Sequence, residues 1–117
     1  MKRLSIFVSG NGTNLQRIAE YFADNKDVEI ANVVCNNPKA YSIERAKKLG
    51  IPLRMITKQD FNSEAFIKEL QSLGIDLIVL AGFLWKLPED LVKAFPKKIV
   101  NIHPALLPKY GGKGFYD

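Results

Sequence analysis

Asn101 and His103 are the two side chains of this sequence whose types and spacing best suit chemistry. They follow the apolar run Ile99–Val100, and His103 is the chain's only histidine. Because side chains alternate between the faces of a strand, a strand that runs to this point places both on one face. An amide beside an imidazole can polarise a carbonyl group and transfer a proton at neutral pH. The alternative is that His103 only hydrogen-bonds the loop after the strand.

A glycine-rich loop after the first apolar run is a candidate phosphate site. It comprises Gly10, Asn11, Gly12, Thr13 and Asn14. Glycines let the backbone approach a ligand closely, and the N-terminus of the following helix offers free N–H groups and a partial positive charge. The loop lacks the third glycine of a dinucleotide-binding fingerprint and the Lys-Ser/Thr ending of a P-loop. The alternative is a turn that only caps the helix.

The loop after the fourth apolar run carries a group of large apolar side chains. Gly82 allows close approach, and it is followed by Phe83, Leu84, Trp85, Lys86 and Leu87. Together Phe83, Leu84, Trp85 and Leu87 make an apolar wall suited to holding a flat ring. The alternative is a plain hydrophobic connection into the next helix.

Five short apolar runs alternate with helical patterns along the chain. Strands are predicted over residues 4–8, 28–35, 52–56, 76–81 and 98–102, and helices begin near residues 13, 42, 63 and 88. Ser42 is the expected N-cap of the second helix, and Asn62 or Ser63 that of the third. The pattern predicts an α/β fold with an open, Rossmann-like, mostly parallel sheet and helices on both faces. If the strand order is 3-2-1-4-5, the three loops lie at one edge of the sheet.

Composition limits the class of protein. The 117 residues suffice for a single domain over residues 1–117, and no apolar stretch is long enough to span a membrane. The single Cys35 cannot form an internal disulfide, so we expect a cytoplasmic protein. The net charge of +5 fits small anionic ligands, nucleic acid or a solvated surface. The glycine-rich end after Lys109 leads to no further element, so we expect the chain to be truncated after Asp117.

Three motifs together resemble the folate-dependent formyltransferase family, and within it the members that act on glycinamide ribonucleotide. They are Ser9–Gln16, Ala81–Leu84 and Asn101–Pro108. The resemblance implies transfer of a formyl group from 10-formyltetrahydrofolate, as co-substrate, to the amine of glycinamide ribonucleotide in purine (IMP) biosynthesis. It implies small-molecule partners only, with no metal, nucleic acid or membrane.

The resemblance also implies roles for particular residues. Asn101 and His103 would be catalytic. The substrate's ribose phosphate would lie on Gly10, Asn11, Gly12, Thr13 and Asn14. The folate would lie on Leu84, Trp85, Lys86, Leu87 and Asn101. The family completes its site with an aspartate that comes later in the chain than Asp117, which is therefore not that residue.

Two alternatives to the transferase remain open. A formyltetrahydrofolate deformylase shares the histidine motif but does not need a phosphate site. The 117 residues could also be a non-catalytic module that binds a phosphate ligand.

Overall fold

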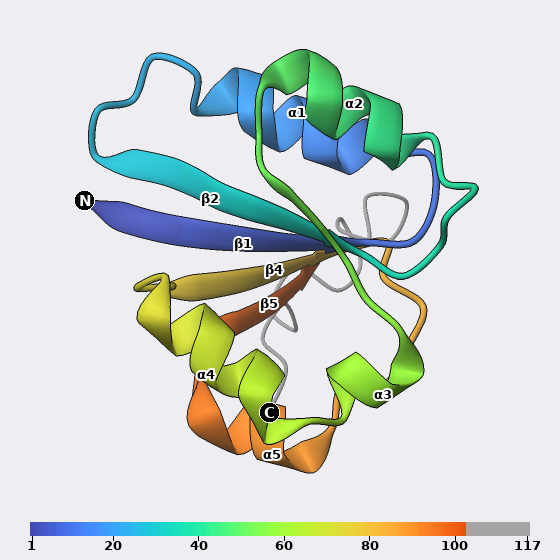
Figure 1. The fold of residues 1–117 in the computed structure, drawn as a ribbon. Coiled ribbons are helices and arrows are strands. Elements are labelled where there is room, and N and C mark those ends of the chain that lie inside the picture. The colour runs from blue at the N-terminus through green and yellow to red at the C-terminus, as the bar shows by residue number, and fades with distance from the viewer. Residues whose placement is uncertain (103–117) are drawn as a thin grey trace, which may run out of the picture.

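The computed structural model describes residues 1–102, which form a five-stranded parallel sheet with helices on both faces (Figure 1). The strands are β1 (Lys2–Val8), β2 (Val28–Cys35), β3 (Leu53–Met55), β4 (Leu77–Ala81) and β5 (Ile99–Ile102). The helices are α1 (Thr13–Tyr21), α2 (Ser42–Leu49), α3 (Lys58–Phe61), α4 (Glu64–Ser72) and α5 (Glu89–Ala94). The strand order is β3-β2-β1-β4-β5, which confirms the predicted fold class and is the order under which the three loops meet at one edge.

The helices divide into two layers. In Figure 1, α1 and α2 lie on one side of the sheet, and α3, α4 and α5 lie on the other. The side chains of β1 alternate accordingly, so that Ile6 and Val8 pack with α1 while Phe7 packs with α4. Each side of the sheet therefore has its own apolar core. No helix within residues 1–102 is long and apolar enough to cross a membrane.

Two predicted helix caps have different outcomes. Ser63 is confirmed as the N-cap of α4, since its Oγ accepts the N–H of Phe66 at 3.2 Å. The prediction for Ser42 is wrong, because Tyr41 takes the cap position and Ser42 is the first, fully buried residue of α2. The physical reason is that the carbonyl oxygen of Gly10 accepts the Ser42 N–H at 3.2 Å. The N–H group at the start of α2 thus has its hydrogen-bond acceptor in a distant loop, and no serine side chain is needed to cap the helix.

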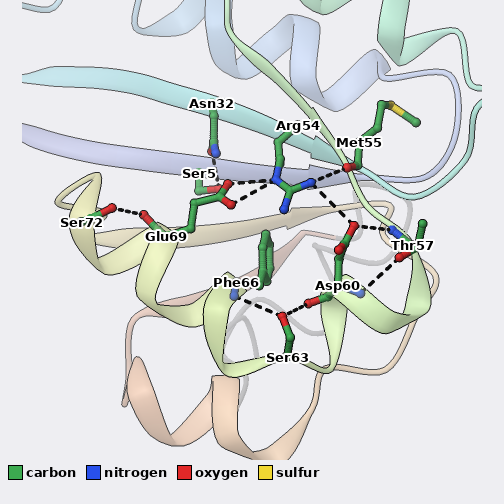
Figure 2. A network of polar contacts seen from close by, with 10 residues as sticks. All are labelled: Ser5, Asn32, Arg54, Met55, Thr57, Asp60, Ser63, Phe66, Glu69 and Ser72. Atoms are coloured by element: carbon green, nitrogen blue, oxygen red, sulfur yellow. Dashed lines mark hydrogen bonds and ion pairs between the residues drawn. The ribbon is translucent and has the colours of Figure 1, made fainter.

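Helix α3 is the one element of the described chain that the apolar pattern did not indicate. It is held by a capping box in which Thr57 and Asp60 bond each other's backbone N–H groups. Figure 2 shows how Arg54 on β3 joins this helix to α4. The Arg54 Nε donates to Glu69 at 2.9 Å, and Nη1 lies 3.7 Å from Asp60 Oδ2. The bond to Glu69 raises the pKa of Arg54, so the guanidinium stays charged at every accessible pH.

Candidate functional site

The loop between β1 and α1 runs close against the start of α2. Gly12 has φ +79°, a left-handed conformation that favours glycine. A Cβ atom at this position would lie 2.8 Å from Ser42 Cβ and 3.0 Å from Ser42 Cα, which is closer than carbon atoms approach. Both the backbone conformation and the space therefore require glycine here. Gly10 is different, since a Cβ added there would meet no atom within 4 Å.

Asn11 closes the turn that leads into α1, whose N-cap residue is Gly12. Its Oδ1 accepts the Thr13 N–H at 3.0 Å and the Thr13 hydroxyl at 2.8 Å. This is the helix-capping turn that the sequence left open, with Gly12 at the N-cap and the Asn11 side chain on the N–H of the first helical residue. The backbone amides at the start of α1 carry the positive end of the helix dipole.

A pocket of about 460 Å³ opens where this loop meets the end of β4. Its walls are Gly10, Asn11, Gly12, Thr13, Asn14, Arg17, Ala81 and Gly82. The five residues predicted from the glycine-rich loop thus line a single pocket. It lies between the carboxyl ends of β1 and β4, at the point where the strand order reverses and where open α/β sheets bind ligands.

Arg17 lines this pocket and was not identified from the sequence. It stands four positions after Thr13, so both lie on the same face of α1. This helical spacing was the signal that could have found it. Its exposed guanidinium adds a positive charge next to the amide-rich wall.

The loop between β4 and α5 is anchored by apolar side chains. The rings of Phe83 and Trp85 lie 5.4 Å and 5.7 Å from that of Phe61, and Leu87 is only 4% exposed. Leu84 points the other way and is 83% exposed. The predicted apolar wall is therefore divided: three of its side chains pack against the core and one faces solvent. Lys86 is exposed.

Ser9 joins the two loops. Its Oγ accepts the Leu84 N–H at 2.9 Å, and its carbonyl oxygen accepts the Asn37 side-chain amide at 3.2 Å. Ser9 is buried, with only 3% of the residue exposed. A small hydroxyl between two glycine-containing loops gives no distinctive sequence signal, and so this connection was missed.

Asn101 lies near the end of β5, at the same edge of the sheet. It is paired in register with Leu80 of β4 and is half-buried. It follows Ile99 by two positions, so it lies on the face of the sheet that packs with α4 and α5. His103 and the rest of its motif lie outside the described residues. The structure thus brings Asn101 to the edge that holds both loops.

A parallel α/β sheet with a polar pocket at its switch point defines a ligand-binding domain of the Rossmann-like class. The sequence matches the family described as formyl transferase over residues 2–116. The chain therefore belongs to the formyl transferase family, which confirms the resemblance found in its motifs.

Individual relatives agree with this assignment. The chain is 40% identical to a phosphoribosylglycinamide formyltransferase of Haemophilus influenzae, covering 100% of this chain and 58% of that protein. It is 36% identical to the Bacillus subtilis protein of the same name, in a match that covers 96% of this chain and 60% of that protein. A solved structure of glycinamide ribonucleotide transformylase 1 from Geobacillus kaustophilus superimposes with a TM-score of 0.78 at 41% identity. That match covers 97% of this chain and 63% of the other.

The chain thus spans about three fifths of the length of these relatives.

Proposed function

We propose that this chain is the nucleotide-binding portion of an enzyme that transfers a formyl group from 10-formyltetrahydrofolate to the amine of glycinamide ribonucleotide. The observation that carries the proposal is the pocket at the start of α1, which is lined by a glycine-rich loop and Arg17. A helix N-terminus with an adjacent guanidinium is suited to a phosphate group. The names of the relatives supply the particular substrate.

In this proposal the two ligands lie on different loops of the same edge. The ribose phosphate lies on Gly12, Thr13 and Asn14. It accepts hydrogen bonds from the backbone N–H groups of Gly12 and Asn14 and from the side-chain amide of Asn14, and Arg17 partly neutralises its charge. The folate lies along residues 84–87, where Leu84 presents an exposed apolar side chain. Ser9 sets the spacing between the two sites through its bond to the Leu84 N–H.

The chemistry assigned to Asn101 and His103 is acyl transfer. The substrate amine attacks the formyl carbon, a new C–N bond forms, and the carbonyl oxygen gains negative charge. The Asn101 amide and a protonated His103 would donate hydrogen bonds to that oxygen. The bond from carbon to the folate N10 then breaks as His103 helps move the amine's proton to N10. The role of His103 rests on the sequence alone, and an unchanged transfer rate in His103→Ala of the complete enzyme would contradict it.

The same proposal includes the partners. They are two small molecules, with formyl folate consumed as a co-substrate and no metal ion, nucleic acid or membrane involved. A cytoplasmic location belongs to it as well, supported by a single cysteine, Cys35, which is buried and unpaired in the described chain.

The experiment that tests the proposal is calorimetric titration of glycinamide ribonucleotide into this chain. The expected result is saturable binding that weakens about tenfold or more in Asn14→Ala, since a tenfold loss corresponds to about one hydrogen bond to a charged group. Asn25→Ala is the matched control, because Asn25 is exposed and bonds only its own turn at Asp27. It should bind as the unaltered chain does.

Two results would contradict the proposal. A folded chain that binds inorganic phosphate but not glycinamide ribonucleotide would show that the substrate is wrong. Binding that is equally weakened by both asparagine variants would show that the ligand does not occupy this pocket.

A further inference from the structure

Arg45 extends from α2 to the loop between β1 and α1. Its Nε donates to the carbonyl oxygen of Asn11 at 2.6 Å. The carbonyl oxygen of the preceding residue, Gly10, is also turned toward α2, where it accepts the Ser42 N–H at 3.2 Å. Two successive carbonyl groups of the loop therefore face α2 and are held there from a different element of the fold.

The orientation of these carbonyls determines where the following amides point. All peptide bonds of the described chain are trans, so each N–H points to the opposite side from the carbonyl of the same peptide group. The N–H groups of Asn11 and Gly12 consequently face away from α2. No residue of α2 lines the pocket, and both Asn11 and Gly12 do. Within residues 1–102, neither N–H has a backbone acceptor outside the regular elements. Successive N–H groups aimed into one cavity form an anion-binding nest.

Arg45 is itself held in place. Its guanidinium carbon lies 5.0 Å from the centre of the Tyr41 ring, and the residue is half-buried. Its Cδ lies 3.0 Å from the position that a Cβ of Gly12 would occupy, so the side chain packs directly on the loop. An arginine fixed by a ring, a carbonyl and the loop backbone loses little further freedom when a ligand binds.

We propose that Arg45 is a positioning residue for the substrate's phosphate. By holding the Asn11 carbonyl, it keeps the Gly12 amide aimed into the pocket, without touching the phosphate itself. The inference rests on the proposed function, since it takes the phosphate of that substrate as the anion.

Lys48 provides a matched control. It lies on the same helix, and its Nζ is 5.9 Å from the centre of the same Tyr41 ring. Within residues 1–102 it makes no hydrogen bond or ion pair with the loop. Lys48→Met therefore removes one positive charge from the same face, whereas Arg45→Met removes both the charge and the bond to Asn11.

The test is calorimetric titration of the unaltered chain and both variants with three ligands: glycinamide ribonucleotide, the same molecule without its phosphate, and inorganic phosphate. We expect Arg45→Met to weaken binding of glycinamide ribonucleotide about tenfold and Lys48→Met to weaken it less than about twofold. Affinity for the phosphate-free molecule should be the same in all three proteins. If Arg45 had a purely structural role, Arg45→Met would lower the affinity for glycinamide ribonucleotide and for the phosphate-free molecule together. If Arg45→Met does not fold, Arg45→Lys keeps the charge but lacks the Nε–H, and it should still bind more weakly by at least about threefold.

The possible failures are distinct. An equal loss of affinity in Arg45→Met and Lys48→Met would show that only the net charge matters, and it would overturn the inference. Unchanged binding in a folded Arg45→Met would overturn it as well. If the unaltered chain binds inorganic phosphate but not glycinamide ribonucleotide, the proposed function fails, and the role of Arg45 is decided by the inorganic phosphate titrations. If the unaltered chain binds neither, both proposals fail.

Discussion

The two loops at the carboxyl edge of the sheet are held by different forces. The loop between β1 and α1 is fixed by directed hydrogen bonds, from Arg45 to Asn11 and from Ser42 to Gly10. The loop between β4 and α5 is fixed by apolar packing, with Leu87 in the core and the Trp85 ring against Phe61. The hydrogen bond from the Leu84 N–H to the Ser9 Oγ connects them.

This difference has a consequence for what each loop can bind. Hydrogen bonds to the carbonyl side of a peptide leave its N–H side available, so the first loop presents donors to an anion. Packing of alternate apolar side chains leaves the intervening ones outside, so the second loop presents Leu84 as an apolar surface. The way a loop is anchored thus decides which chemical groups remain for a ligand.

The largest effect is expected for Leu87→Ala, which removes the packing that holds the second loop. We expect this change to lower the free energy of unfolding by about 3 kcal/mol, because it removes a buried side chain and leaves a cavity beneath the second loop. Denaturant unfolding measures the loss. Leu84→Ala is the control: with 83% of the residue exposed, it should change stability by less than about 0.5 kcal/mol. Equal effects of the two variants would mean that packing does not hold this loop.

A smaller effect is expected for Gly12→Ala in the first loop. The left-handed backbone and the 2.8 Å approach to Ser42 Cβ should cost about 2 kcal/mol of stability. The pocket should also lose its affinity for phosphate ligands, because the loop must move away from α2. The measurements are denaturant unfolding and phosphate titration. Gly10→Ala, where an added Cβ meets no atom within 4 Å, is the control for stability and should leave the free energy of unfolding nearly unchanged.

The smallest effect tests the connection between the loops. Ser9→Ala removes the acceptor of the Leu84 N–H, and we expect a loss of about 1 kcal/mol. Hydrogen exchange of the Leu84 amide should become faster, while exchange in α4 should not change. Ser72→Ala is the control, since Ser72 is exposed and its hydroxyl bonds only the carbonyl of Glu69 within its own helix end. An unaltered exchange rate at Leu84 in Ser9→Ala would show that the two loops are independent.

Much of this fold could be predicted because the sheet is buried on both faces. Strands such as Leu77–Ala81 then appear as continuous apolar runs bounded by turn residues, and the alternation of strands and helices leaves few topologies. Helix α3 was missed because four residues are too few to show a helical period. Ser42 was assigned as a cap because sequence does not show that the Gly10 carbonyl would reach the helix end.

The site was predictable to the extent that its residues are adjacent in sequence. The loop Gly10–Asn14 was found as a unit because its glycines and the following helix have a local meaning. Arg45 and Ser9 were not found, since their roles depend on partners that lie 34 and 75 positions away in sequence. Such contacts follow from the tertiary fold, and no local pattern encodes them.

Trp85 gives the chain a natural optical reporter. It is the only tryptophan among the 117 residues, and it is half-buried against Phe61 and Phe83 in the loop assigned to the folate. Its fluorescence emission therefore comes from one known place in the fold. Arrival of an aromatic ligand at Leu84, or exposure of the indole when the loop leaves the core, should each change the intensity or wavelength of that emission. Both events can be followed in this chain without attaching a dye.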